Sequence, residues 1–233
     1  MKLIFDIGFN VGEFTDVCFC KFPQCSVVSV EANSQLCNNV PKHLLLNKNF
    51  TLLNNVVSDK DGEHIDFYIS PYATGVSTAS IEFMENSRFT KGSKNLQKNS
   101  IKWSSPIKVL STSIDAMIDK YGTPDLIKID VEGYELNVLL GLTTKVNDIC
   151  FEWHEEESEQ LYKILEHLEK LGYTDFGIIG YFAEGDIFDK ATYSDKGDPY
   201  LEYPKNFYRR NELELEKLIN TERRINYGMF FVK

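Results

Sequence analysis

Short apolar runs alternate along this chain with stretches in which apolar residues recur every three or four positions. The first pattern is typical of buried strands, and the second of helices that pack one face on a sheet. The predicted strands cover residues 3–7, 26–31, 50–57, 63–70, 107–110, 125–131, 148–154, 176–182 and 226–232. The predicted helices cover residues 12–21, 35–46, 113–121, 132–142 and 158–171. This alternation predicts an α/β fold with a mostly parallel sheet and helices on both of its faces.

Two polar segments interrupt the alternation. Residues 71–105 are rich in Ser, Asn and Lys, and a loop of that length in a compact domain usually has a function. Residues 183–224 are acidic and rich in tyrosine, and they separate the last two predicted strands, which we expect to pair as a hairpin at one edge. We expect a single domain, 1–233, in which both segments are candidates for a substrate cover.

The first predicted strand leads directly into a turn with spaced glycines. Gly8 suits a tight turn, and Gly12 would let the next helix or a ligand approach the backbone closely. The free N–H groups at the start of that helix favour a carboxylate or a phosphate. Asp6 lies at the carboxyl end of the strand and favours an ammonium group. The two preferences together fit the amino-acid part of a ligand.

The second strand ends in another acid, Glu31, which follows Asp6 by 25 residues. That spacing suits one strand–helix–strand unit, in which a terminal carboxylate accepts hydrogen bonds from ribose hydroxyls. An amino-acid group at the first loop and a ribose at the second describe S-adenosylmethionine. A nicotinamide dinucleotide is the alternative, although the glycines here are spaced G-x-x-x-G rather than G-x-G-x-x-G. A glycine turn with no ligand also stays open.

Composition narrows the class of protein. The 233 residues are 42% hydrophobic and 13% aromatic, enough for a real core, and the net charge of −10 disfavours a wide contact with nucleic acid. We expect no membrane span and no secretion signal, since no apolar run approaches about 20 residues. The cysteines lack C-x-x-C spacing, which disfavours zinc and favours a reduced, cytoplasmic chain. They are Cys18, Cys20, Cys25, Cys37 and Cys150.

Four segments together resemble one family, the FkbM-type S-adenosylmethionine-dependent methyltransferases. They are Phe5-Asp6-Ile7-Gly8-Phe9-Asn10-Val11-Gly12, then Val57-Ser58-Asp59 with Gly62, then Ser113-Ile114-Asp115, and the K-I-D-V-E-G-x-E run within 125–135. The last segment is the most specific of the four, and the resemblance covers about residues 3–154. Phe9 departs from the family pattern because a small residue is commoner there, and we expect it to crowd the cofactor.

The resemblance implies a Rossmann-like sheet of seven strands with an antiparallel last strand. It also implies methyl transfer to an oxygen of a sugar or another hydroxylated metabolite. The first turn would hold the methionine end of the cofactor, the end of the second strand the ribose, and residues 55–58 the adenine, with Asp130 next to the reacting methyl. The implied cofactor-binding residues are Asp6, Gly8, Asn10, Gly12, Glu31, Ala32, Val57, Ser58 and Asp130.

Catalytic candidates gather at the ends of two neighbouring strands. A sugar hydroxyl needs a base or a metal ion to take its proton, and Asp130 is the best-placed acid. Glu152 and His154 point to the same side of the next strand, and His154 is a second candidate base. Asp130 and Glu152 could instead hold Mg²⁺, and Lys128 would orient a carboxylate. The alternatives are that Asp130 caps a helix, that Glu152 pairs with Lys128, and that His154 has no chemical role.

The leading hypothesis is an O-methyltransferase that acts on a sugar, a glycan or a sugar nucleotide. The alternatives are an NAD-dependent oxidoreductase and a non-catalytic protein that binds a cofactor with the same fold. The acceptor would be a small molecule or a glycan and not a nucleic acid, and a homodimer is left open.

Overall fold

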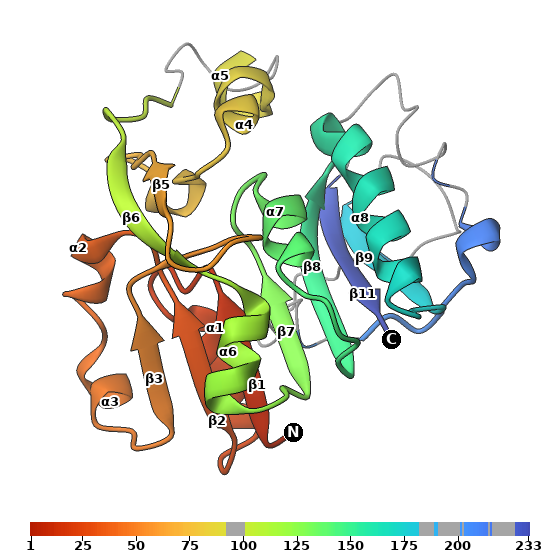
Figure 1. Ribbon diagram of the computed structural model, residues 1–233, viewed down its shortest axis with the longest axis horizontal. Helices are drawn as coiled ribbons and strands as arrows, with labels where there is room; N and C mark the ends of the chain where they lie inside the picture. Colours follow the sequence, from red (N-terminus) through yellow and green to blue (C-terminus); the bar gives the residue numbers. More distant parts are fainter. Residues whose placement is uncertain (92–100, 182–188, 191–200, 202, 214, 216–226) are drawn as a thin grey trace.

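The computed structural model describes residues 1–91, 101–181, 189–190, 201, 203–213, 215 and 227–233 (Figure 1). Its strands are β1 Leu3–Ile7, β2 Ser26–Val30, β3 Phe50–Leu53, β4 Val56–Val57, β5 His64–Phe67, β6 Ile107–Thr112, β7 Leu126–Ile129, β8 Asp148–His154, β9 Phe176–Tyr181, β10 Asp189–Lys190 and β11 Tyr227–Val232. Its α-helices are α1 Glu13–Lys21, α2 Ser34–Cys37, α3 Lys42–Leu45, α4 Ile81–Asn86, α5 Arg88–Lys91, α6 Ile114–Tyr121, α7 Glu135–Leu140 and α8 Ser158–Lys170. No helix within these ranges is long and apolar enough to cross a bilayer.

The main sheet has the strand order β10-β9-β11-β8-β7-β1-β2-β3. Five neighbouring strands in this order run parallel to one another: β8, β7, β1, β2 and β3. Strand β11 runs antiparallel to both β8 and β9. A mostly parallel Rossmann-like sheet of seven strands with a reversed last strand is therefore confirmed, and the two-residue β10 adds an edge. The predicted antiparallel pairing of the last two long strands is confirmed as well.

The two faces of the sheet bury different clusters because successive strand residues point to opposite sides. Ile127 and Phe151 face the side that α6, α7 and α8 cover. Leu126 and Cys150 face the other side, where they pack with Phe14 of α1. Helices on both faces leave the ends of the strands as the free edge of the sheet, which is where a ligand can enter.

The order of the strands places a switch point between β1 and β7. The chain moves from β1 outward to β2 and β3, and then returns to continue on the other side with β7 and β8. In open α/β sheets the loops at such a point part from each other, and they leave a crevice at the carboxyl ends of the strands. The loops that follow β1, β2 and β7 lie together at this end of the sheet (Figure 1).

The predicted strand over residues 50–57 is wrong as a single element. The side chain of Asn54 donates hydrogen bonds to the carbonyl oxygens of Glu31 and Ala32, at 2.9 and 3.1 Å. These bonds hold the chain at the end of β2, so that β3 stops and β4 joins a second sheet of order β4-β6-β5. The predicted helix over 35–46 is divided into α2 and α3, and Pro41 lies directly before α3.

Candidate active site

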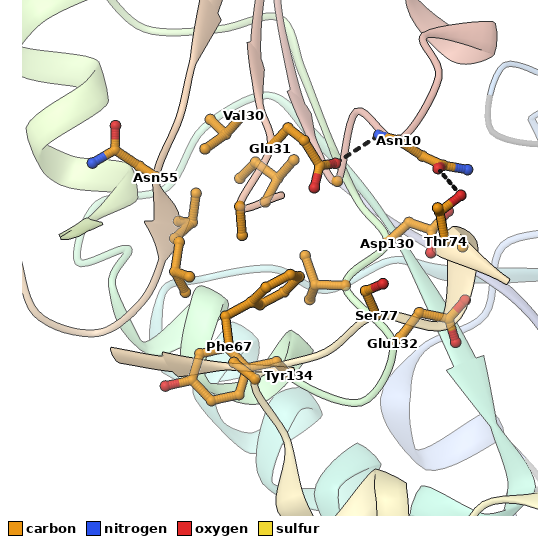
Figure 2. A pocket seen from close by; sticks show the side chains of 18 residues that line it. Asn10, Val30, Glu31, Asn55, Phe67, Thr74, Ser77, Asp130, Glu132 and Tyr134 are labelled. Carbon is orange, nitrogen blue, oxygen red and sulfur yellow. Dashed lines mark hydrogen bonds between the residues drawn. The ribbon is translucent and has the colours of Figure 1, made fainter. Parts of the chain in front are cut away.

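A cavity of about 220 Å³ lies at the carboxyl ends of β1, β2 and β7 (Figure 2). The register pairs Ile7 with both Val30 and Ile129, so the residues that follow these three positions meet at one edge. They are Gly8, Glu31 and Asp130, and all three line the cavity. The structure thus brings together the ends of three predicted strands, as the sequence interpretation required.

The first turn is built from residues in the left-handed region. Gly8, Asn10 and Gly12 have φ of 88°, 49° and 93°. The backbone N–H groups of Gly8 and Phe9 both donate to the carbonyl oxygen of Val30 at 3.0 Å, which ties the turn to β2. Gly8 and Asn10 line the cavity, whereas Gly12 lies behind it.

Phe9 does not crowd the cavity. Its ring is buried in a separate cluster with Val40 and Leu44, and its edge lies next to Gly12. A larger residue at position 12 would meet that ring at less than 3 Å, because an added Cβ would lie 2.7 Å from it. Gly12 therefore gives room to Phe9, and the expected clash with a cofactor is wrong.

Glu31 holds the first two loops in position. One carboxylate oxygen accepts a hydrogen bond from the backbone N–H of Asn10 at 2.8 Å, and the other accepts one from Asn33 at 2.7 Å. Burial raises the pKa of this carboxyl, and the two backbone donors oppose that rise. Ala32 lies next to Glu31 in the lining of the cavity.

Lys128 supports the turn from behind the cavity. Its ammonium donates to the carbonyl oxygen of Gly8 at 2.7 Å and lies 3.2 Å from Asp6 and 3.5 Å from Asp130. Asp6 is fully buried, and it also accepts a hydrogen bond from the hydroxyl of Thr15 at 2.7 Å. This geometry fits Asp6 and Lys128 as supports of the turn better than as direct contacts of a ligand.

The wall on the other side of the cavity is mostly apolar. It includes Val57 as well as Phe67 and Tyr134, which the sequence interpretation missed because they come from β5 and from the turn before α7 (Figure 2). Ser58 is buried outside the lining, and its hydroxyl donates to Asp59 at 2.9 Å. A flat apolar wall of this kind suits an aromatic base.

Part of the polar segment 71–105 lines the cavity. Thr74 donates to the side chain of Asn10 at 3.1 Å, and Thr78 donates to the carbonyl oxygen of Glu132 at 2.7 Å. The indole N–H of Trp103 donates to the carbonyl oxygen of Val76 at 2.8 Å. The first two bonds attach the segment to Asn10 and Glu132 on the cavity wall, and the third joins two parts of the segment itself. Residues 92–100 and most of the 183–224 insertion lie outside the described residues.

An acidic group continues from the cavity towards β8. Glu132 lines the cavity, and its carboxylate lies with ligand atoms of Glu152 and His154 within 4.8 Å of one another. The imidazole Nε2 of His154 lies 3.2 Å from Glu152. The structure therefore pairs Glu152 with His154. Of the two residues that the sequence had suggested for a metal, Asp130 and Glu152, only Glu152 belongs to this group. The most specific sequence segment contains Glu132 but gave it no role in the site, because its position depends on a backbone φ of 54°.

The ionisable side chains of this acidic group strongly change one another's pKa. Burial, followed by the nearby Glu152 and Asp130, raises the pKa of Glu132 well above its usual range. Burial alone would lower the pKa of His154, but the carboxylates of Glu152 and Glu157 outweigh it and raise the pKa to about 9. His154 therefore carries a proton at neutral pH in this arrangement, which favours Asp130 over His154 as a base.

The raised pKa of His154 predicts a pH-dependent stability. The pKa is about 9 in the folded protein against a usual 6.5, so the stabilisation is complete below pH 6.5 and is lost as the pH rises towards 9. We expect the free energy of unfolding, measured by urea denaturation with chelator present, to fall by on the order of 1 to 3 kcal/mol over this range. His154→Gln should flatten the profile, and equal slopes in both proteins would contradict the assignment.

The alternative role of Asp130 as a helix cap is wrong. The helix that follows is α7, which begins at Glu135 after Tyr134, and no side chain caps it. Glu135 is buried and accepts a hydrogen bond from the backbone N–H of Val131 at 3.0 Å, so it holds the turn together. Asp130 lies 3.5 Å from Lys128, is hydrogen-bonded to the side chain of Glu152 and lines the cavity.

Comparison with known proteins decides the family. The sequence model of one protein family, the methyltransferase FkbM domain, matches residues 6–174. These residues include every strand end that lines the cavity. The chain belongs to the FkbM methyltransferase family. This FkbM protein is therefore an S-adenosylmethionine-dependent methyltransferase, as the resemblance implied, and the oxidoreductase alternative is wrong.

Solved structures show a distant likeness to this FkbM methyltransferase. Precorrin-6y C5,15-methyltransferase from Geobacter metallireducens GS-15 is 12% identical with a TM-score of 0.45, over 99% of this chain and 80% of that one. The plantazolicin methyltransferase BpumL, solved in complex with SAH, is 11% identical with a TM-score of 0.35, over 100% and 76%. Likenesses of this degree carry no argument about the acceptor. No curated protein matches the sequence.

Proposed function

We propose that this methyltransferase transfers a methyl group from S-adenosylmethionine to a hydroxyl oxygen of a sugar, a glycan or a sugar nucleotide. The observation that carries the proposal is the polarity of the cavity. Its apolar wall ends at Phe67 and Tyr134, and its acidic end is formed by Asp130 and Glu132 (Figure 2). A carboxylate at the acidic end can accept a proton from a neutral hydroxyl, and a neutral hydroxyl at this end suits it better than an anionic group would.

The residues of the cavity fit the methyl donor in three parts. The apolar wall with Val57 and Phe67 suits the adenine, and Glu31 between the two loops suits the ribose hydroxyls. The turn at Gly8 and Asn10 suits the methionine end, because a side chain at position 8 would fill the space beside the carbonyl of Asp130. When bound, the donor supplies an activated methyl group on a sulfonium.

The protein's part in the reaction is to align the acceptor and to accept its proton. In the in-line displacement the acceptor oxygen forms a bond to the methyl carbon while the carbon–sulfur bond breaks. The electron pair of the broken bond stays on sulfur. Alignment of the two reacting atoms supplies much of the rate. Asp130 would take the proton from the hydroxyl, while Lys128 keeps the Asp130 carboxylate oriented at 3.5 Å.

The proposal is tested with a methyl-transfer assay against a panel of monosaccharides, sugar nucleotides, amines and thiols. We expect turnover with one class of hydroxylated acceptor and none with amines or thiols of similar size. Turnover confined to an amine would overturn the O-methylation. Tight binding of S-adenosylhomocysteine without turnover on any acceptor would favour the non-catalytic alternative.

Replacement of Glu31 with Ala should weaken the binding of S-adenosylhomocysteine by about 100-fold, because about two charge-assisted hydrogen bonds to the ribose are lost. Isothermal titration calorimetry measures the effect. Glu63→Ala, at an exposed position close to β5, is the control and should leave the affinity unchanged. Since Glu31 also binds two backbone N–H groups, Glu31→Gln is a second variant that keeps the side-chain shape. An affinity within threefold of the parent in both variants would contradict ribose binding.

A further inference from the structure

The acidic group next to the cavity contains the donor set of a metal site. Ligand atoms of Glu132, Glu152 and His154 all lie within 4.8 Å of one another. Metal–ligand distances of about 2.0–2.2 Å allow two ligands of one ion to lie up to about 4.4 Å apart. Small rotations of the side chains would therefore bring the three atoms into contact with a single ion.

The local backbone directs these groups towards one point. Glu152 and His154 are two positions apart on β8 and share a face of the sheet. Glu132 has a left-handed φ of 54°, which is uncommon for a residue other than glycine, asparagine or aspartate, and such strain concentrates at functional sites. The Oε2 atom of Glu132 is buried and has no hydrogen-bond partner within the described part of the chain. Backbone strain and the burial of an unpaired carboxylate oxygen both cost free energy at Glu132. A bound ligand would offset this cost by pairing with that oxygen.

The charge around the group also calls for a cation. Asp130 lines the cavity together with Glu132, and a carboxylate oxygen of Glu157 lies close to Gly133, the residue after Glu132. The nearest side-chain cations already have carboxylate partners: Lys128 lies against Asp6 at 3.2 Å, and Arg88 lies against Glu156 at 2.9 Å. A divalent ion bound in place of the proton on His154 would add further positive charge to this acidic group.

We propose that Glu132, Glu152 and His154 bind a divalent first-row transition-metal ion of the Mn²⁺ class. Two carboxylates suit a hard divalent ion, while an imidazole ligand favours a transition metal over Mg²⁺. The site differs from the Mg²⁺ site expected at Asp130 and Glu152, because the ligands are one imidazole and two glutamates. Three protein ligands leave further positions open, and Glu132 places the ion at the cavity wall. A role for the ion in activating the acceptor hydroxyl rests on the proposed function, whereas its binding does not.

The test is titration of the chelator-treated protein with Mn²⁺, followed by electron paramagnetic resonance of the free ion. We expect binding of one equivalent, an affinity at least tenfold lower in Glu132→Gln and in Glu152→Gln, and an unchanged affinity in Glu166→Gln. Glu166 is the control because it is exposed and pairs with Lys170 on α8 at 2.8 Å. Displacement of Mn²⁺ by an equal concentration of Mg²⁺ would overturn the transition-metal assignment.

Binding of S-adenosylhomocysteine to the same samples separates this proposal from the proposed function and also reports folding. A protein that binds S-adenosylhomocysteine but no Mn²⁺ overturns the metal site and leaves the methyltransferase site intact. A protein that binds Mn²⁺ but not S-adenosylhomocysteine overturns the cofactor site alone. An equal Mn²⁺ affinity in the parent and both glutamine variants would place the ion elsewhere and also overturn the proposal.

Discussion

Asp130→Asn should lower kcat for methyl transfer by about 10²- to 10⁴-fold while the affinity for S-adenosylhomocysteine stays within about threefold. Asn keeps the shape of the side chain and can accept a hydrogen bond from the acceptor. It cannot take the proton at neutral pH, so the loss should fall on the chemical step. The acceptor found in the panel assay supplies the rate, and calorimetry supplies the affinity.

The position of Asp130 explains why the expected effect is this large. It directly follows β7, it lies at the acidic end of the cavity, and its backbone N–H donates to the carbonyl oxygen of Ile7 at 3.0 Å. The neighbouring strand β1 thus holds its backbone, and Lys128 of β7 lies against its side chain. A rigid base loses little alignment when its partner binds, which is the condition for efficient proton transfer.

The control for this prediction is Asp66→Asn. Asp66 lies on β5 outside the cavity lining, is partly exposed and pairs with Lys108 at 2.9 Å, so its replacement should change neither kcat nor affinity. Equal losses of rate and affinity in Asp130→Asn would assign Asp130 to binding rather than to proton transfer. An unchanged kcat would remove it from the reaction altogether.

The sheet could be predicted from the sequence because its signals are local. The apolar run at 125–131 and the glycine turn after β1 each follow from residues close together in the chain, and parallel strands necessarily bring their carboxyl ends to one edge. Glu31 and Asp130 were therefore identifiable as residues of that edge. Their meeting depends on strand order, which the alternation of strands and helices restricts to a few choices.

The rest of the cavity could not be predicted because it depends on contacts between distant segments. Phe67 and Tyr134 are 67 residues apart, yet both line the apolar wall. The hydrogen bond from Lys128 to the carbonyl oxygen of Gly8 joins residues separated by 120 positions. A lysine in an apolar strand predicts a carboxylate partner, and Asp6 and Asp130 provide it, but nothing in the residue pattern indicates a carbonyl.

Gly8→Ala should lower the free energy of unfolding by about 4 kcal/mol, the largest stability effect expected for a change of one methyl group in this chain. The Cβ of an alanine at this position would lie 1.8 Å from the carbonyl oxygen of Asp130. That distance is far inside van der Waals contact, and the atom it meets belongs to backbone that the parallel strands hold in place. The φ of 88° adds the strain of the left-handed region.

Gly62→Ala separates the two causes of that loss. Gly62 has a comparable φ of 76°, but nothing lies within 4 Å of the position of its Cβ, so only the backbone strain remains and costs about 1 kcal/mol. Urea denaturation of both variants measures the difference. If Gly8→Ala costs no more than Gly62→Ala, the turn does not pack against the carbonyl of Asp130. The proposed position of the donor's methionine end next to Asp130 depends on this close approach, so that proposal would then be wrong as well.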